Sequence, residues 1–420
     1  MTRLRVLWMS FHRTARFEEV SALLRAGAEV VPTTGEYGAF PNAVELPEER
    51  DPLHPPWRLT CTVPPDVLRV VRDLRAYENH KAIPPAVVEA LDRWFDVVWV
   101  GTFSTLALEL LVRYRGAVVL RPYGGFPYTM SLGSLRNRNR ALAVFGASER
   151  FAFCPAIPYQ ALIEDPRLSR RETFWPACVT PSRLGHRWAG ASSDAVACEV
   201  MGLIDRYRAP EYARFVSAFG DLPLRIFGQN PRGGSTGDDP RIVGTLDDDP
   251  FFGGIAGCRV MLYTGLGWKY HLHYHPLEAL MMGVPVIFFS SSAIAHTAMW
   301  MGASRDALRA AGMCDTPVEA HALASRLLRD PHEAVAVSER QEILRTIYRP
   351  EPWDGAPREL LASIARAAAY SRDHRDPVVD RPPASSLADV FGRVPRRAGE
   401  LARRAGARLA RAGRQDPRDA

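Results

Sequence analysis

Short apolar runs alternate with helical segments along this chain, and the alternation starts twice. Near the N-terminus, LRVLWMS has the pattern of a buried parallel strand, RFEEVSALLRAG that of a helix ended by Gly27, and AEVVPT that of a second strand. Strand, helix and strand follow again in DVVWVGTF, STLALELLVRYRG and AVVLRPYGG. This alternation predicts an α/β domain, in which helices cover a parallel sheet.

The same pattern restarts after the segment ETFWPACVTPS and continues through RVMLYTG and VPVIFFS to three further helical segments. The chain has 420 residues, 47% of them hydrophobic, which is enough for two hydrophobic cores. We therefore predict an α/β fold of two tandem Rossmann-like domains with a ligand-binding cleft between them. The expected divisions are a first domain at 1–185, a second domain at 186–370, a linker at 371–386 and a basic tail at 387–420.

The net charge of +6 is concentrated at the C-terminal end. Residues 388–420 contain nine arginines and four acidic residues, so the two domains together are close to neutral. A neutral body gives no basic bias towards nucleic acid, and no nucleic-acid partner is expected. Apolar residues recur in the tail at three- and four-residue steps with arginines between them, which is typical of a basic amphipathic helix on an anionic membrane surface. A solvated tail, or one docked on its own domains, is the alternative.

The cysteine pattern and the apolar stretches favour a cytoplasmic protein. The six cysteines form no CxxC pair, which indicates reduced thiols and no cysteine-based zinc site. The apolar run at the N-terminus is too short for a secretion signal. The uncharged stretch 279–302 contains Gly283, Pro285 and three consecutive serines, so we interpret it as a helix end, a turn and a strand instead of a membrane span. With the tail, the expected location is cytoplasmic and peripheral to the inner face of a membrane.

The stretch HLHYHPLEALMMGVPVIFF, residues 271–289, carries the strongest functional signal. It follows a strand and a glycine-containing loop, and Pro276 marks the first turn of a helix. Ligands of open α/β sheets bind at the carboxyl ends of the strands, where glycines admit a close backbone approach and a helix N-terminus favours phosphate. The three alternating histidines could instead hold a metal, but their spacing is not a usual zinc signature, and no metal is expected.

The segment HPLEALMMGVPVIF resembles the donor-site segment of GT-B glycosyltransferases, in particular the retaining group of glycogen and sucrose synthases. The resemblance is specific for residues 241–291, and the tandem domains extend it over about residues 1–370. It implies that Glu278 holds the ribose of a nucleotide-diphosphate sugar. Members of that group commonly carry a second acid, separated from the first by seven residues, and that place is Tyr270 here. The donor-binding residues expected from the loop and helix are Gly265, Gly267, Trp268, Tyr270, His271, His273, His275 and Glu278.

Polar residues also follow the strands of the first domain, where they would face the second domain. Arg121 ends an apolar strand, so it should bind phosphate or a carboxylated sugar, or form a salt bridge at the domain interface. His12 follows the first strand and is a candidate general base. Residues expected near the acceptor are Thr102, Tyr123, Gly124 and Gly125. The triplet 247–249 of aspartates precedes Pro250 and is interpreted as a helix cap instead of a metal site.

The predicted function is transfer of a sugar from a nucleotide-diphosphate donor to a glycan or lipid-linked acceptor, in assembly of a surface glycan. Lys269, helix N-termini and Arg121 would stabilise the leaving diphosphate, and no cofactor would be required. A sugar-nucleotide epimerase of the same architecture is one alternative, and it would release sugar nucleotide without an acceptor. A sugar-nucleotide or glycan-binding protein without turnover is the other, and it would show no donor hydrolysis.

Overall fold

The computed structural model describes most of the chain between residues 3 and 373. The described ranges are 3–10, 13–32, 57–71, 74, 82–101, 105–124, 127–132, 135–170, 173–188, 190, 194–199, 209–227, 239–244, 246–265 and 271–373. The predicted tail at 387–420 lies outside them, as does all but the start of the predicted linker.

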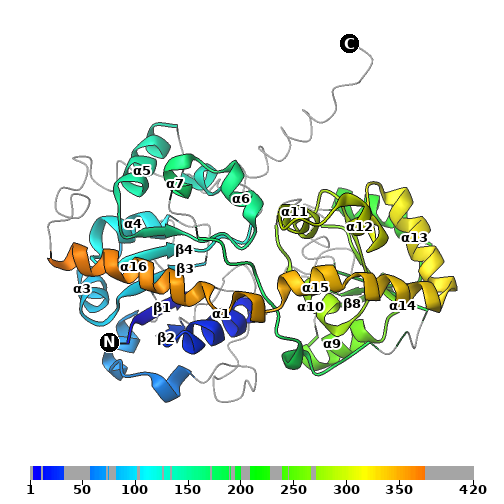
Figure 1. Ribbon diagram of the computed structural model, residues 1–420, viewed down its shortest axis with the longest axis horizontal. Helices are drawn as coiled ribbons and strands as arrows, with labels where there is room; N and C mark the ends of the chain where they lie inside the picture. Colours follow the sequence, from blue (N-terminus) through cyan, green and yellow to red (C-terminus); the bar gives the residue numbers. More distant parts are fainter. Residues whose placement is uncertain are drawn as a thin grey trace, which may run out of the picture.

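The first domain is a five-stranded parallel sheet with strand order β2-β1-β3-β4-β5. Its strands are short apolar runs with no exposed residue, because helices cover both faces of the sheet (Figure 1). Its elements are β1 (Arg5–Met9), α1 (Arg13–Arg25), β2 (Glu29–Pro32), α2 (Pro65–Val71), α3 (Pro85–Trp94), β3 (Val97–Val100), α4 (Leu106–Arg113), β4 (Ala117–Leu120), η3 (Tyr128–Leu132), α5 (Leu135–Ala147), β5 (Phe151–Phe153), α6 (Pro158–Ile163), α7 (Pro166–Ser169) and the short 3-10 helix η1 (Trp57–Thr60).

The second domain is a six-stranded sheet with order β11-β10-β9-β6-β7-β8, also parallel throughout. This is the strand order of dinucleotide-binding Rossmann domains. Its elements are β6 (Val196–Glu199), α8 (Ala209–Phe219), β7 (Leu224–Phe227), β8 (Ile242–Gly244), α9 (Asp248–Ala256), β9 (Val260–Tyr263), α10 (Tyr274–Met282), β10 (Val286–Phe289), α11 (Ala293–Trp300), α12 (Arg305–Ala310), β11 (Met313–Cys314), α13 (Pro317–Arg329), α14 (Pro331–Arg340) and α15 (Glu342–Tyr348). The predicted fold class, two Rossmann-like α/β domains, is confirmed.

The chain crosses between the domains twice. The first crossing contains the 3-10 helix η4 (Pro181–Leu184), and the second contains η5 (Glu351–Trp353). The last described helix, α16 (Ala356–Asp373), then lies against β4 and α1 of the first domain (Figure 1). The expected division at 370 assigned this helix to the second domain, and the expected linker began at 371, within the helix. The polar composition that follows residue 370 gave no sign that α16 buries Leu360, Leu361 and Ile364 and that the helix contacts β4 and α1.

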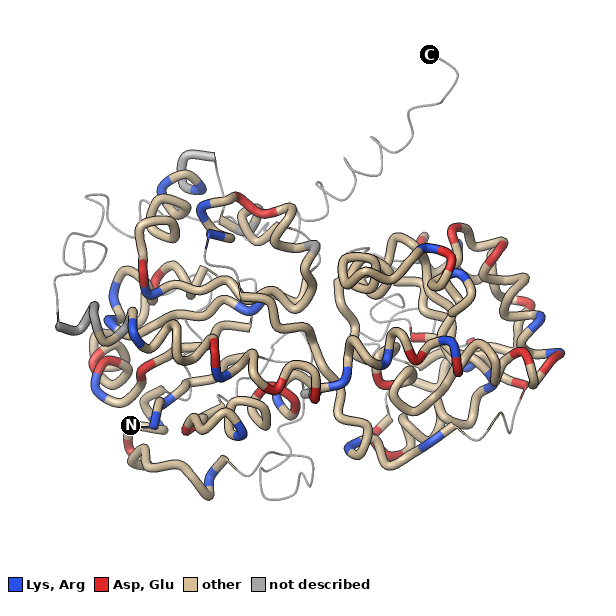
Figure 2. Tube along the Cα trace, viewed as in Figure 1, with Lys and Arg blue, Asp and Glu red and all other residues tan. Residues whose placement is uncertain are grey.

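Charged residues of both signs are interspersed over the two domains along the described trace (Figure 2). A basic stripe of the kind that binds nucleic acid is not seen along that trace. Of the helices that the structure describes, none combines the length and apolar character needed to span a membrane.

Candidate functional site

The strand order of the second sheet reverses between β6 and β9, since the chain builds outward from β6 through β7 and β8 and then returns to β9 on the other side. Ligands of open α/β sheets bind outside the carboxyl ends of the strands at such a reversal. Those ends carry Glu199 on β6 and Tyr263 on β9. Helix α10 begins beside them and brings His275 to Glu199, so this edge is the candidate site.

Glu199 and His275 form an ion pair at the reversal point. Nδ1 of His275 lies 2.7 Å from Oε1 of Glu199, and the imidazole packs on the ring of Phe251. Burial alone would lower the pKa of His275, but the Glu199 carboxylate outweighs burial and raises that pKa to about 9. His275 is therefore a cation in the first turn of α10, where the helix dipole already contributes partial positive charge.

The other two histidines lie together ahead of the helix. The rings of His271 and His273 are 4.8 Å apart, and the ring of Tyr263 packs edge-on against His273. Burial and the neighbouring His273 lower the pKa of His271 to about 3, so His271 is neutral. The sequence placed the start of this helix at Pro276, but α10 begins two residues earlier, at Tyr274, so His275 lies in the helix and not in the loop before it.

The loop that follows β4 in the first domain contacts residues 271 and 272, just ahead of α10. The backbone N–H of Leu272 donates to the carbonyl of Tyr123 at 2.9 Å, and Gly124 forms an antiparallel bridge with His271. Gly124 has φ 92°, a left-handed conformation that favours glycine. The structure thus brings together two sets of residues that the sequence predicted separately, Tyr123 and Gly124 from the acceptor side and His271 from the donor side.

Glu278 lies on the same helix and is 1% exposed. Its Oε1 accepts hydrogen bonds from Thr14 Oγ1 at 2.8 Å and from Arg183 Nη2 at 2.5 Å. Its Oε2 is buried and has no hydrogen-bond partner in the described part of the chain. A buried oxygen that accepts no hydrogen bond is costly, so this oxygen is suited to accept one from a hydroxyl donor.

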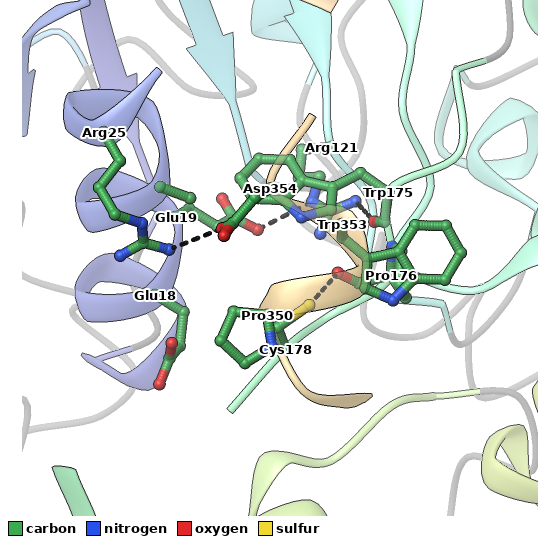
Figure 3. A pocket seen from close by; sticks show the side chains of 11 residues that line it. Glu18, Glu19, Arg25, Arg121, Trp175, Pro176, Cys178, Pro350, Trp353 and Asp354 are labelled. Atoms are coloured by element: carbon green, nitrogen blue, oxygen red, sulfur yellow. Dashed lines mark hydrogen bonds and ion pairs between the residues drawn. The ribbon is translucent and has the colours of Figure 1, made fainter. Parts of the chain in front are cut away.

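Arg121 lies in the core of the first domain and is 0% exposed. Its Nε donates to Glu19 Oε1 at 2.8 Å, and its Nη1 donates to the carbonyl oxygen of Trp175 (Figure 3). The Glu19 carboxylate holds the pKa of Arg121 above its ordinary value despite burial. The prediction that Arg121 faces a ligand is corrected: it forms the salt bridge named as the alternative, but with a partner inside its own domain.

The cavity next to Arg121 has a volume of about 10 Å³, which is room for one water molecule at most (Figure 3). A larger cavity of about 490 Å³ lies between the two domain crossings, and its lining includes Arg187 and Glu351. It also reaches Met281, at the far end of α10 from the histidines. Neither cavity opens on the Glu199 and His275 pair, so the candidate site rests on its residues and their contacts.

Several predicted site residues lie outside the described residues. They are His12, Thr102, Gly125, Gly267, Trp268, Lys269 and Tyr270. Gly265 is described and has φ 59°.

The aspartate triplet lies at the start of α9. Asp247 takes the N-cap position as expected, but its side chain makes no capping hydrogen bond, and Asp249 lies 3.0 Å from His186. Within the described ranges no group of three or more metal-ligating side chains comes together.

Three residues of the site were not predicted from the sequence. Glu199 had a usable signal, since an acid that ends the apolar strand VACE should face a ligand or a partner. Thr14 and Arg183 had none, because their contacts with Glu278 span 264 and 95 residues of sequence.

Solved structures share this fold at low sequence identity. The N-terminal domain of trehalose-6-phosphate phosphatase from Candida albicans aligns with a TM-score of 0.52 and 10% identity, over 87% of this chain and 97% of that one. A trehalose-6-phosphate synthase studied for glycosyl transfer with retention aligns with a TM-score of 0.50 and 12% identity, over 87% and 99%. The apo structure of OtsA aligns with a TM-score of 0.50 and 13% identity, also over 87% and 99%. No protein-family model and no curated protein matches the chain. The chain has the two-domain GT-B fold that the sequence resemblance predicted.

Proposed function

We propose that this chain is a glycosyltransferase that takes a sugar from a nucleoside-diphosphate sugar. One observation supports it most. Helix α10 begins at the strand-order reversal of the second sheet and carries His275 and Glu278 near its N-terminus. The segment just before this helix is hydrogen-bonded to the first domain at Tyr123. A donor held there would lie between the two domains, where an acceptor from the first domain can reach it.

His275 and the helix N-terminus would bind the diphosphate. A cation in the first turn of a helix is unfavourable by itself, because it repels the positive end of the helix dipole. Glu199 offsets part of that cost at 2.7 Å, and a bound diphosphate would offset the rest. As the sugar leaves the diphosphate, negative charge grows on the leaving oxygen, and these groups stabilise it. We propose the same role for Lys269.

Glu278 would hold the ribose through Oε2, the oxygen that has no partner in the described part of the chain. Neutral His271 and the glycines Gly124 and Gly265 would lie near the sugar and exclude water. The acceptor would be a glycan or a lipid-linked sugar in surface-glycan assembly.

A thermal-shift screen of nucleoside diphosphates and their sugars tests the proposal, because a ligand that binds only the native state raises its stability. The Glu278→Gln variant should bind the tightest ligand of the screen less favourably by about 1.5 to 3 kcal/mol, the contribution of a hydrogen bond to a charged group. Glutamine is preferable to alanine, since alanine would leave Arg183 without its closest partner. Wild-type binding by Glu278→Gln would contradict the assigned role.

Product analysis then separates the candidate activities. Incubation of the bound donor with and without acceptor sugars should give transfer only when an acceptor is present. An isomeric sugar nucleotide formed without acceptor would indicate an epimerase. Tight donor binding with neither transfer nor hydrolysis would indicate a binding protein.

For residues 387–420 we propose reversible attachment to an anionic membrane, which suits a lipid-linked acceptor. Each arginine near such a surface contributes about 1 kcal/mol, so four or five give a weak and salt-sensitive attachment. In liposome sedimentation, the full chain should pellet with anionic vesicles at low salt and be released at high salt. A chain that ends at Ser386 is the control, and equal behaviour of the two would rule the attachment out.

A further inference from the structure

The larger cavity lies where the chain passes between the domains, and it is separate from the candidate site. Its volume of about 490 Å³ is within the range of roughly 300 to 1,000 Å³ that small-molecule sites occupy. Arg187 lines it from the first crossing, Arg349 from the end of α15, and Glu351 from the second crossing. The cavity therefore has the size of a ligand site and carries charged side chains from both crossings.

Positive charge in this cavity is only partly compensated. Arg187 is exposed and forms no ion pair or hydrogen bond with any residue that the structure describes. Nη1 of Arg349 lies 2.8 Å from Oε1 of Glu342, but that carboxylate also accepts a hydrogen bond from Nε of Arg345 at 2.7 Å. Two guanidinium groups share one carboxylate, so a second positive charge is left uncompensated beside that of Arg187.

Glu351 adds a negative charge from the second crossing. Within the described chain it forms no ion pair with Arg187 or Arg349, although all three line the same cavity. A bare phosphate is repelled by this carboxylate, whereas a hydroxyl group donates a hydrogen bond to it. A molecule that combines an anionic group with hydroxyl groups therefore satisfies both kinds of charge.

The two arginines favour phosphate as the anionic group. A guanidinium binds phosphate through parallel hydrogen bonds, and the several oxygens of a phosphate can accept from two guanidinium groups at once. A phosphate monoester carries a charge of about −1.5 to −2 at pH 7, which matches two uncompensated positive charges better than a single carboxylate does.

Tryptophan side chains fix both crossings beside the cavity. Trp188 donates from its backbone N–H to the carbonyl of Met282 at 2.9 Å and from Nε1 to the carbonyl of Cys258 at 3.0 Å. Trp353 donates from Nε1 to the carbonyl of Ile347 at 2.8 Å. The backbone that carries the charged side chains is thus held in place before a ligand arrives, which lowers the entropic cost of binding.

We propose that this cavity is a second ligand site, for a small phosphate monoester with free hydroxyl groups. The phosphate would lie between Arg187 and Arg349, and a hydroxyl group would donate to Glu351. Such a ligand contacts both crossings at once, so it would hold them together where the two domains are connected. The site uses no residue of the proposed sugar transfer and goes beyond that function.

Calorimetric titration of the full chain with glycerol 3-phosphate, inorganic phosphate and glycerol tests the proposal. Glycerol 3-phosphate should bind more tightly than inorganic phosphate, and glycerol should not bind. Arg187→Gln should weaken the binding of glycerol 3-phosphate by about tenfold or more, the contribution of a hydrogen bond between charged groups. Arg340→Gln replaces an exposed arginine of α14 outside the cavity and should bind as the wild type does. A wild-type protein that binds no glycerol 3-phosphate, or an Arg187→Gln variant that binds it equally well, overturns the site.

Glu351→Gln tests the hydroxyl contact, because it removes the negative charge and keeps the shape. It should bind inorganic phosphate about threefold more tightly than the wild type does and prefer glycerol 3-phosphate less strongly. An unchanged preference would contradict the contact with Glu351. Malonate, which carries two carboxylates, tests the ligand class: binding as tight as that of glycerol 3-phosphate would contradict a site for phosphate.

Amide hydrogen exchange shows where the ligand binds. Glycerol 3-phosphate should slow exchange in residues 185–188 and 349–353 and leave β9, beside the candidate site, unchanged. Slower exchange in β9 alone would place the phosphate at the proposed donor site and overturn the second site. A failure to bind nucleotides would contradict the proposed function only, so the two proposals can fail separately.

Discussion

At the scale of single residues, the ion pair of Glu199 and His275 makes the stability of the fold depend on pH. The raised pKa of a histidine means that its folded state binds the proton more tightly than the unfolded chain does. The pair therefore stabilises the fold fully below the unfolded pKa of about 6.5. This contribution is lost as the pH rises through about 9, the folded pKa of His275.

The Glu199→Gln variant should lose that dependence, because burial then keeps His275 neutral. Between pH 6.5 and 9 the wild-type free energy of unfolding should fall by on the order of 3 kcal/mol, at about 1.4 kcal/mol per pKa unit. The curve for Glu199→Gln should be nearly flat. Urea unfolding across this range measures both, with the exposed Glu339→Gln on α14 as control. Parallel curves for wild type and Glu199→Gln would contradict the pairing.

At the scale of elements, Glu164 connects the end of α6 to the start of η3. Its carboxylate accepts backbone N–H bonds from Tyr128 and Thr129, and burial raises its pKa to about 7. An acid with a raised folded pKa binds protons more tightly in the native state, so stability falls as the pH rises from about 4.5 to about 7.

Glu164→Gln keeps an acceptor for the N–H groups and cannot ionise. Relative to wild type, the variant should therefore gain stability on going from pH 5 to pH 8, by up to about 3 kcal/mol. Urea midpoints at the two pH values give the comparison. A stability difference that stays constant between pH 5 and pH 8 would show that Glu164 does not titrate in this range.

The elements themselves were largely predictable, and the site only partly so. The strands β1, β3, β4 and β9 are apolar runs that only a covered parallel sheet can bury, so local pattern was enough. The start of α10 was missed by two residues. Proline favours the first position of a helix, but here Pro276 is the third residue of α10, after Tyr274 and His275. Glu278 was predicted by resemblance. The hydrogen bonds that orient it depend on tertiary structure, which local pattern does not encode.

At the scale of the whole molecule, α16 makes the first domain depend on the C-terminal part of the chain. Leu361 of this helix is buried, and the helix lies against β4 and α1. Leu361→Ala should cost about 2 to 5 kcal/mol, as buried leucine truncations do. The loss should fall on the first domain, although Leu361 follows the entire second domain in the sequence.

Amide hydrogen exchange can locate that loss. In Leu361→Ala, exchange should accelerate in β4 (Ala117–Leu120) and leave β9 (Val260–Tyr263) unchanged. The exposed Arg358→Ala on the same helix is the matched control. Faster exchange in β9 with β4 unaffected would place α16 with the second domain instead.

The return of α16 also sets an order of events during synthesis on the ribosome. The last strand of the first sheet ends at Phe153, and α16 begins at Ala356. Roughly 200 residues separate them, which take about 10 to 40 s to translate at common rates. Throughout that interval the newly made first sheet lacks the helix that lies against β4. The second domain is continuous in sequence and can fold during the same interval. The later domain is thus free to fold before the earlier one is finished, and apolar surface at β4 is open to chaperones during the delay.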